Sequence, residues 1–136
     1  MSLDLHIEAD RVLTIPMLST ALAKAGATEV ENVNGALEAA FASGLRLTAD
    51  DETTDFTIYA EDKKGLEFKV GMRCSIRIKG PEPEGQSSMD ELEKIAESIA
   101  QTCSSLFLLT FQYESTLYWR DAMGLHRSRA YGRREI

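Results

Sequence analysis

The chain has 136 residues, 43% of them hydrophobic and 27% charged, and a formal net charge of −7. One globular domain of this size buries a core without disulfides or metal. The acidic balance disfavours non-specific nucleic-acid binding, which requires a basic surface.

Other features of the composition argue against a membrane or secreted protein. No run approaches the roughly 18 apolar residues of a membrane-spanning helix, and the first ten residues lack the pattern of a signal peptide. The two cysteines are too few for a disulfide framework. We therefore expect a single domain over residues 1–136, located in the cytoplasm and without membrane contact.

The negative charge is concentrated in the first half of the chain. Residues 1–65 carry 12 acidic and 5 basic side chains, whereas residues 106–136 carry 3 and 5. We expect the first half to provide the acidic surface of the domain.

The first predicted elements are a strand and a helix. Apolar residues alternate with polar ones over residues 3–8, which is typical of a strand with one solvent-facing side. A helix then follows, with Thr14 as a capping residue, Pro16 in the first turn and Gly26 at the end.

The region after this helix has a weaker pattern. Residues 27–34 fit either a loop or a short strand, and residues 35–44 favour a helix of one or two turns, with a strand as the alternative. Leu45 and Leu47 lead into an acidic loop over residues 49–55.

A β-hairpin is the next predicted unit. Apolar and polar residues alternate over 56–60 and again over 68–79, and the intervening EDKKG sequence at 61–65 suits a turn. The register is expected to be firm, because a one-residue slip would expose every apolar side chain.

A second helix is predicted over residues 88–104, after a loop rich in Gly and Pro at 80–86. Ser88 and Glu91 have the spacing of a capping box. Apolar residues recur within the helix at intervals of three and four, so that one face should pack on the sheet.

The last predicted elements are a long strand and a return strand. Residues 107–120 alternate, and we expect the odd positions 107–113 to face the helix. A β-bulge near residues 114–116 would shift the phase and expose either Tyr118 or Trp119. A strand over 125–129 and a loose tail over 130–136 complete the chain.

Together these elements predict an α+β fold. We expect a mostly antiparallel sheet of about 4–6 strands with two main helices packed on one face. The other face is then left for solvent or a partner.

The residue types that commonly carry chemistry are sparse and isolated. His6 and His126 have no metal-ligand spacing. Cys74 and Cys103 fall on apolar faces, where a free cysteine packs as a small hydrophobe. We therefore predict no catalytic residues, no metal, no cofactor and no enzymatic activity.

Two charged groups have alternative interpretations. The acidic residues at 50–55 suit either a solvated loop, a cation site or a protein-binding loop. Lys69, Arg73, Arg77 and Lys79 share one side of a strand. That stripe would suit phosphate, but no exposed aromatic accompanies it, which favours a solvated face paired with acidic neighbours such as Glu61.

The helix SSMDELEKIAESIAQTC and the hairpin FLLTFQYESTLYWRDAMGLH, in a small acidic α+β chain, resemble those of immunity proteins of bacterial polymorphic toxin systems. The resemblance implies a protein that binds one cognate toxin and blocks its active site. Acidic surface would complement a basic toxin cleft, and Trp, Tyr and Arg are enriched in interface hot spots. The resulting candidate partner-binding residues are Asp50, Asp51, Glu52, Asp55, Tyr118, Trp119 and Arg120.

Two other functions are compatible with the sequence. One is a secretion chaperone for an effector protein, for which a homodimer would be expected. The other is a small-ligand-binding domain, in which Tyr59, Tyr113 or Trp119 would line a pocket beside carboxylates.

Overall fold

The computed structural model describes residues 2–79 and 82–128, with the side chains of residues 2 and 3 excepted. In these ranges the chain forms two helices and one sheet of eight strands. The elements are β1 (Ser2–Ala9), α1 (Ile15–Lys24), β2 (Glu29–Val33), β3 (Ala36–Ala40), β4 (Arg46–Asp50), β5 (Met72–Lys79), α2 (Ser88–Thr102), β6 (Phe107–Phe111), β7 (Ser115–Asp121) and β8 (Gly124–Arg127). The tail predicted at 130–136 lies outside the described residues.

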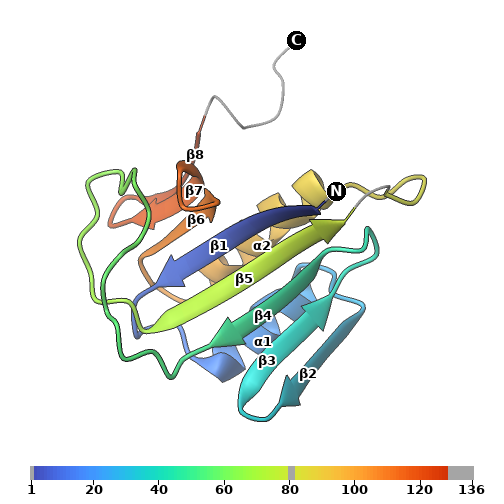
Figure 1. Ribbon diagram of the computed structural model, residues 1–136, viewed down its shortest axis with the longest axis horizontal. Helices are drawn as coiled ribbons and strands as arrows, with labels where there is room; N and C mark the ends of the chain where they lie inside the picture. Colours follow the sequence, from blue (N-terminus) through green and yellow to red (C-terminus); the bar gives the residue numbers. More distant parts are fainter. Residues whose placement is uncertain (1, 80–81, 129–136) are drawn as a thin grey trace.

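The sheet has the strand order β2-β3-β4-β5-β1-β6-β7-β8, and every neighbouring pair is antiparallel. Both helices cover the same face of this sheet (Figure 1). The α+β prediction is therefore confirmed, whereas the predicted number of about 4–6 strands is too low.

The short helix predicted over residues 35–44 is wrong, because this segment forms β3 and the turn after it. Asn34 and Gly35 both have positive φ, 54° and 85°, and join β2 to β3 in a tight hairpin turn. Asn-Gly is the residue pair that such turns prefer. The alanines of β3 suggested a helix, but Leu37 and Ala39 are buried beneath the helices at the strand period of two.

The hairpin predicted over residues 56–79 is also wrong. Only its second half is a strand, β5, and β5 pairs with β1 and β4 instead. Residues 51–71 form a long connection without strand pairing, here called the strap. The alternation over 56–60 arises because Ile58 and Ala60 point inward from this connection.

The long strand predicted over residues 107–120 is two strands, β6 and β7. The chain reverses at Gln112 and Tyr113, which have φ of 53° and 63°. The β-bulge predicted near residues 114–116 is not there, because residues 112–114 form the turn and Ser115 and Thr116 pair with β6. The register of the β6–β7 pair shifts instead between Leu109 and Thr110.

Two hydrophobic clusters lie on opposite faces of the sheet. The main core, between sheet and helices, includes Phe107, Leu109 and Tyr118. The smaller cluster lies beneath the strap, where Ile58, Leu66 and Val70 pack on Leu108. The prediction that the odd positions 107–113 all face the helices fails at Tyr113, whose ring stacks on His6 of β1 instead.

The helices are fixed by caps and by long-range contacts, of which the most buried is made by Glu91. Thr14 and Ser87 accept backbone N–H groups of Met17 and Asp90, so the cap of α2 is Ser87 rather than the predicted Ser88. Glu91, the other residue of the predicted capping box, has a different role. Its carboxylate, buried at the start of α2, accepts hydrogen bonds from the Ser43 N–H at 3.1 Å and from the Ser43 hydroxyl. These two hydrogen bonds hold the β3–β4 turn against α2.

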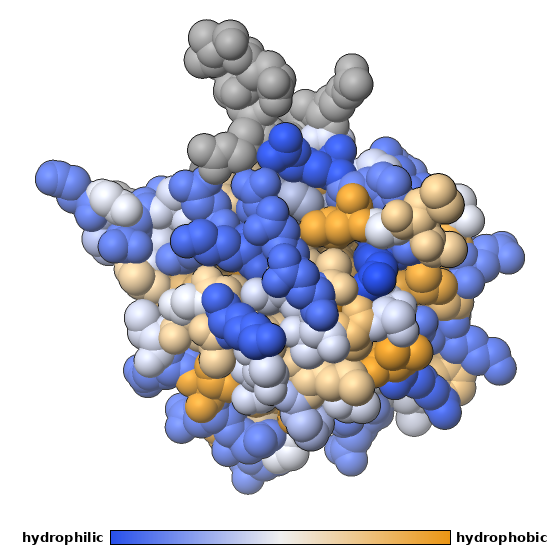
Figure 2. Space-filling model, turned by 180° about the vertical axis from the view of Figure 1, so that it is seen from behind, coloured by the Kyte–Doolittle hydropathy of each residue, from blue (hydrophilic) through white to orange (hydrophobic). Residues whose placement is uncertain are grey.

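The outer side of the helices is mainly hydrophilic, with scattered apolar side chains (Figure 2). This is the pattern of surface helices that bury one face. No helix in residues 2–79 and 82–128 has the length and apolar character needed to span a membrane.

Candidate functional site

The strap is fixed to the open face of the sheet by a buried carboxylate. Glu8 of β1 is fully buried and points away from the helices. Its two oxygens accept the backbone N–H groups of Tyr59 at 2.7 Å and Ala60 at 3.1 Å. Because a buried carboxylate is costly unless it is hydrogen-bonded and paired, these contacts fix the strap at one place.

Arg73 of β5 supplies the opposite charge. Its Nη1 lies 2.8 Å from the Glu8 carboxylate, and its Nη2 donates to the carbonyl oxygens of Asp55 at 2.8 Å and Thr57 at 2.6 Å. The guanidinium also lies 4.1 Å from the centre of the Tyr59 ring. One arginine thus donates to two carbonyl oxygens of the strap, with the cation–π contact to Tyr59 as a further contribution.

The second half of the strap is attached to the β6–β7 hairpin. The Glu61 N–H donates to the Tyr113 carbonyl oxygen at 2.7 Å, and the Thr116 hydroxyl donates to the Asp62 carbonyl oxygen. In Figure 1 the strap is the green connection beside these strands. Both halves of the strap are therefore held by hydrogen bonds to the sheet.

Acidic and aromatic side chains at the start of the strap are coupled. The Tyr59 hydroxyl donates to the Asp55 carboxylate, and the Thr57 N–H donates to the same group at 3.0 Å. The Tyr59 hydrogen bond is the main reason that the pKa of Asp55 falls to about 2. The same bond raises the pKa of Tyr59. Asp55 therefore stays ionised at neutral pH.

Three large apolar side chains are exposed around these acidic residues. Phe56 is 38% exposed, Val12 43% and Tyr59 45%. Phe56 and Val12 line one shallow hollow of about 450 Å³, and Phe56 and Asp51 line a second of about 350 Å³. We call the exposed group Val12, Asp51, Asp55, Phe56 and Tyr59 the strap surface.

The four predicted acidic residues lie close together in the chain and are all exposed. Asp50 ends β4, and its carboxylate accepts the Glu52 N–H at 2.7 Å. Asp51 and Asp55 belong to the strap surface. The structure therefore places two of the acidic candidates, Asp51 and Asp55, beside the exposed apolar group, where Arg11 also lines both hollows.

The other three candidates lie elsewhere, on β7, which is four positions from β4 in the sheet. Tyr118 is 3% exposed and belongs to the main core. Trp119 is half-buried between Lys64, whose Nζ lies 4.8 Å from its ring centre, and His126, whose ring lies at 5.3 Å. Arg120 donates to the carbonyl oxygens of Ala100 and Cys103 and so holds the end of α2.

Sequence reasoning missed the apolar members of the strap surface. Phe56 was assigned to the inner side of a strand, and Val12 lies in the short connection between β1 and α1. It also missed Glu8, because no local pattern links this residue to Arg73, 65 positions away. Two residues of the basic stripe do pair with acidic neighbours across the sheet, as predicted, but Arg73 pairs with Glu8 and Arg77 with Asp4 rather than with Glu61.

The cysteines and histidines occupy packed or paired positions. Cys74 is buried, and burial raises the pKa of its thiol to about 12. His126 lies 2.9 Å from the Asp121 carboxylate. Within the described ranges, no three His, Cys, Asp or Glu side chains are grouped to hold a metal ion.

The fold and this surface define an α+β protein with an open antiparallel sheet, helices on one face and a fixed strap on part of the other. Comparisons of the chain with protein-family models, with curated proteins and with solved structures gave no significant match.

Proposed function

We propose that this chain is a non-catalytic protein-binding domain that acts through the strap surface. The observation that supports the proposal is the exposure of Val12, Phe56 and Tyr59 beside Asp51 and Asp55. Aromatic side chains supply large contact area, and flanking acidic groups select a partner of opposite charge.

The rigid attachment of the strap favours the same function. Glu8 and Arg73 hold the backbone on either side of Phe56 before any partner arrives. A preorganised loop loses less conformational entropy on binding than a mobile one.

The partner that suits this surface is a protein with a basic cleft. We propose specifically that the domain is a bacterial immunity protein that binds and neutralises a cognate toxin in the cytoplasm. Complementary charge accelerates encounter with such a cleft, and the apolar residues slow dissociation.

A growth-rescue assay tests this proposal. The protein is co-expressed with each toxin candidate encoded beside its gene, and growth and complex formation are measured. We expect the natural protein to restore growth and Phe56→Ser with Asp51→Asn to abolish rescue while remaining folded. Met123→Ser is the matched control, since Met123 is 87% exposed on the β7–β8 turn. Undiminished rescue by the double variant would contradict the assigned surface, and failure of the natural protein to bind any encoded neighbour would contradict the function.

A further inference from the structure

A second hollow lies on the open face of the sheet, on the part that the strap leaves uncovered. Its volume is about 410 Å³, within the usual range of small-ligand sites. Strands β4, β5 and β1 form its floor. Its polar lining includes Asp4, His6, Arg46, Ser75, Arg77 and Lys79, together with Thr48.

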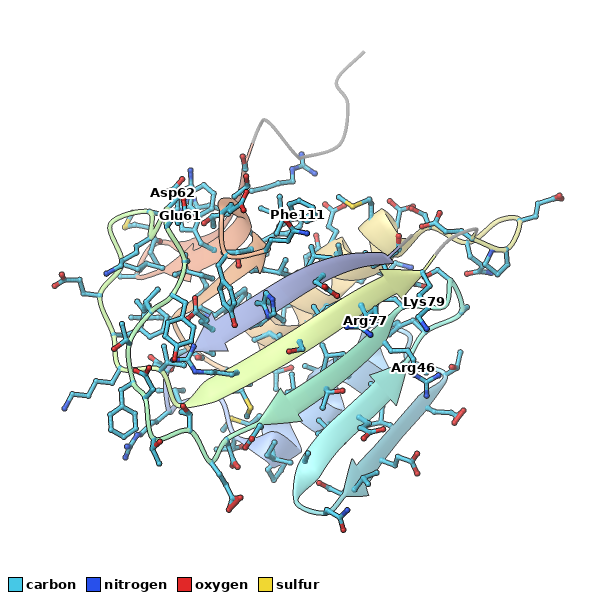
Figure 3. The ribbon with its side chains drawn as sticks, viewed as in Figure 1. Arg46, Glu61, Asp62, Arg77, Lys79 and Phe111 are labelled. Atoms are coloured by element: carbon cyan, nitrogen blue, oxygen red, sulfur yellow. The ribbon has the colours of Figure 1, made fainter. Side chains whose placement is uncertain are left out.

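Three cations meet at one end of this hollow. The strand register places Arg46 of β4 directly opposite Arg77 of β5. Lys79 follows Arg77 by two residues and lies on the same face (Figure 3). Like charges directly opposite each other in a sheet are destabilising, so the fold carries a cost for this arrangement.

Within the described part of the chain, Arg77 is the only one of the three cations with an ion-pair partner. Arg77 Nε lies 3.2 Å from the Asp4 carboxylate. Among residues 2–79 and 82–128, the side chains of Arg46 and Lys79 make no ion pair or hydrogen bond. The lining of the hollow therefore has three positive groups against one negative group.

The floor adds neutral hydrogen-bonding groups. Ser75 is exposed between Thr48 of β4 and His6 of β1, which are its register partners. His6 Nδ1 is buried without a hydrogen-bond partner. The His6 ring stacks on Tyr113 with ring centres 4.0 Å apart, and burial lowers the pKa of His6. The imidazole is then neutral at neutral pH and retains one N–H donor.

We propose that this hollow binds the phosphate group of a small molecule. A phosphate monoester is close to doubly charged at neutral pH, which matches the net charge of the lining. Arginine binds phosphate oxygens through paired N–H groups, and lysine binds them as a point charge. Ser75 adds a hydroxyl donor at the floor.

The surroundings favour a small ligand over a nucleic-acid strand. Glu29, Glu31 and Glu38 lie on the neighbouring strands beside Arg46. A continuous phosphate backbone that crossed this region would meet repulsion from them. The site is distinct from the strap surface, so it adds a ligand to the proposed protein-binding function.

Titrations with inorganic phosphate and with ribose 5-phosphate, followed by amide NMR at constant ionic strength, test the site. We expect shifts at Ser75 and Arg77. Arg46→Gln combined with Lys79→Gln should weaken phosphate binding about tenfold or more. Both changes remove a positive charge, and hydrogen bonds from charged groups are stronger than those from neutral groups. The control is Lys24→Gln with Lys94→Gln, which removes the same charge from exposed positions on the helices.

The two double variants and the two compounds distinguish the possible results of this experiment. Binding of either compound that is lost in the first double variant and kept in the control supports the site. Tighter binding of ribose 5-phosphate identifies an ester as the ligand, and equal binding identifies the free ion. Equal affinity in both double variants, or the same shifts with chloride alone, would overturn the proposal.

Discussion

The open face of the sheet has two halves that use the same residue types in opposite ways. Beneath the strap, the buried Glu8 and the half-buried Arg73 pair with each other and are hydrogen-bonded to the backbone of residues 55–60. On the uncovered half, Arg46 and Arg77 are exposed and lie directly opposite each other on the adjacent strands β4 and β5.

This contrast shows that a strand pattern does not determine the role of its charges. Arg73, Arg77 and Lys79 occupy equivalent alternating positions on β5. Arg73 became a structural residue because the strap covers it, whereas Arg77 and Lys79 remain available to a ligand. The path of residues 51–71 decides which charges are structural.

Removal of the buried carboxylate tests the covered half and has the largest expected effect. Glu8→Ala leaves Arg73 without its ion-pair partner and the N–H groups of Tyr59 and Ala60 without their acceptor. Breaking a buried ion pair in this way costs about 3–5 kcal/mol. Urea unfolding measures the loss.

A matched control on the same strand distinguishes the two halves. Asp4 pairs with Arg77 through exposed side chains, so Asp4→Ala should lower the free energy of unfolding by less than about 1 kcal/mol. The double variant Glu8→Leu with Arg73→Met should recover part of the Glu8→Ala loss. Similar losses for Glu8→Ala and Asp4→Ala would refute the difference between the halves.

A change on the uncovered half should have a smaller effect. Arg46→Thr removes one of two opposed cations, which stabilises the sheet, but it also removes the cation beside Glu29, Glu31 and Glu38, which destabilises it. Because the two contributions oppose each other, the free energy of unfolding should change by less than about 0.5 kcal/mol. Any change should shrink at high salt, because exposed charges are screened. Arg46→Lys keeps the charge and should leave stability unchanged. A loss as large as that of Glu8→Ala would contradict the difference between the halves.

The sequence predicted the two main helices well, placed a helix wrongly where β3 lies, and predicted the sheet less completely. Capping residues and apolar spacing located α1 and α2 almost to the residue. The strand pattern of residues 56–60 was real, but its cause was not pairing: Ile58 and Ala60 alternate because the strap packs on Leu108. A period of two reports which side is buried, not which strand is the neighbour.

The site was only partly predictable for a related reason. The acidic residues at 50–55 are visible as a cluster, because they are adjacent in the chain. Glu8 and Arg73, like Arg46 and Arg77, meet only through the strand order β4-β5-β1. Non-local pairing of this kind leaves no spacing signal in a single sequence.

The smallest expected effect lies where the strap emerges into solvent, at Asp55. The pKa of Asp55 is lowered from 3.8 to about 2, chiefly by the Tyr59 hydroxyl. Because the folded pKa is depressed, this contribution to stability is fully present above pH 3.8 and is lost as the pH falls through about 2.

Tyr59→Phe removes that hydroxyl and should return the pKa of Asp55 toward its ordinary value, as measured by NMR of the carboxyl carbon. The free energy of unfolding should then decrease less as the pH falls from 3.8 to about 2. Tyr113→Phe is the control, because Tyr113 makes no hydrogen bond to Asp55. An unchanged Asp55 titration in Tyr59→Phe would mean that the Thr57 N–H and Arg73 suffice to hold the carboxylate. The start of the strap would then be held by Glu8 and Arg73 without a contribution from the Tyr59 hydroxyl.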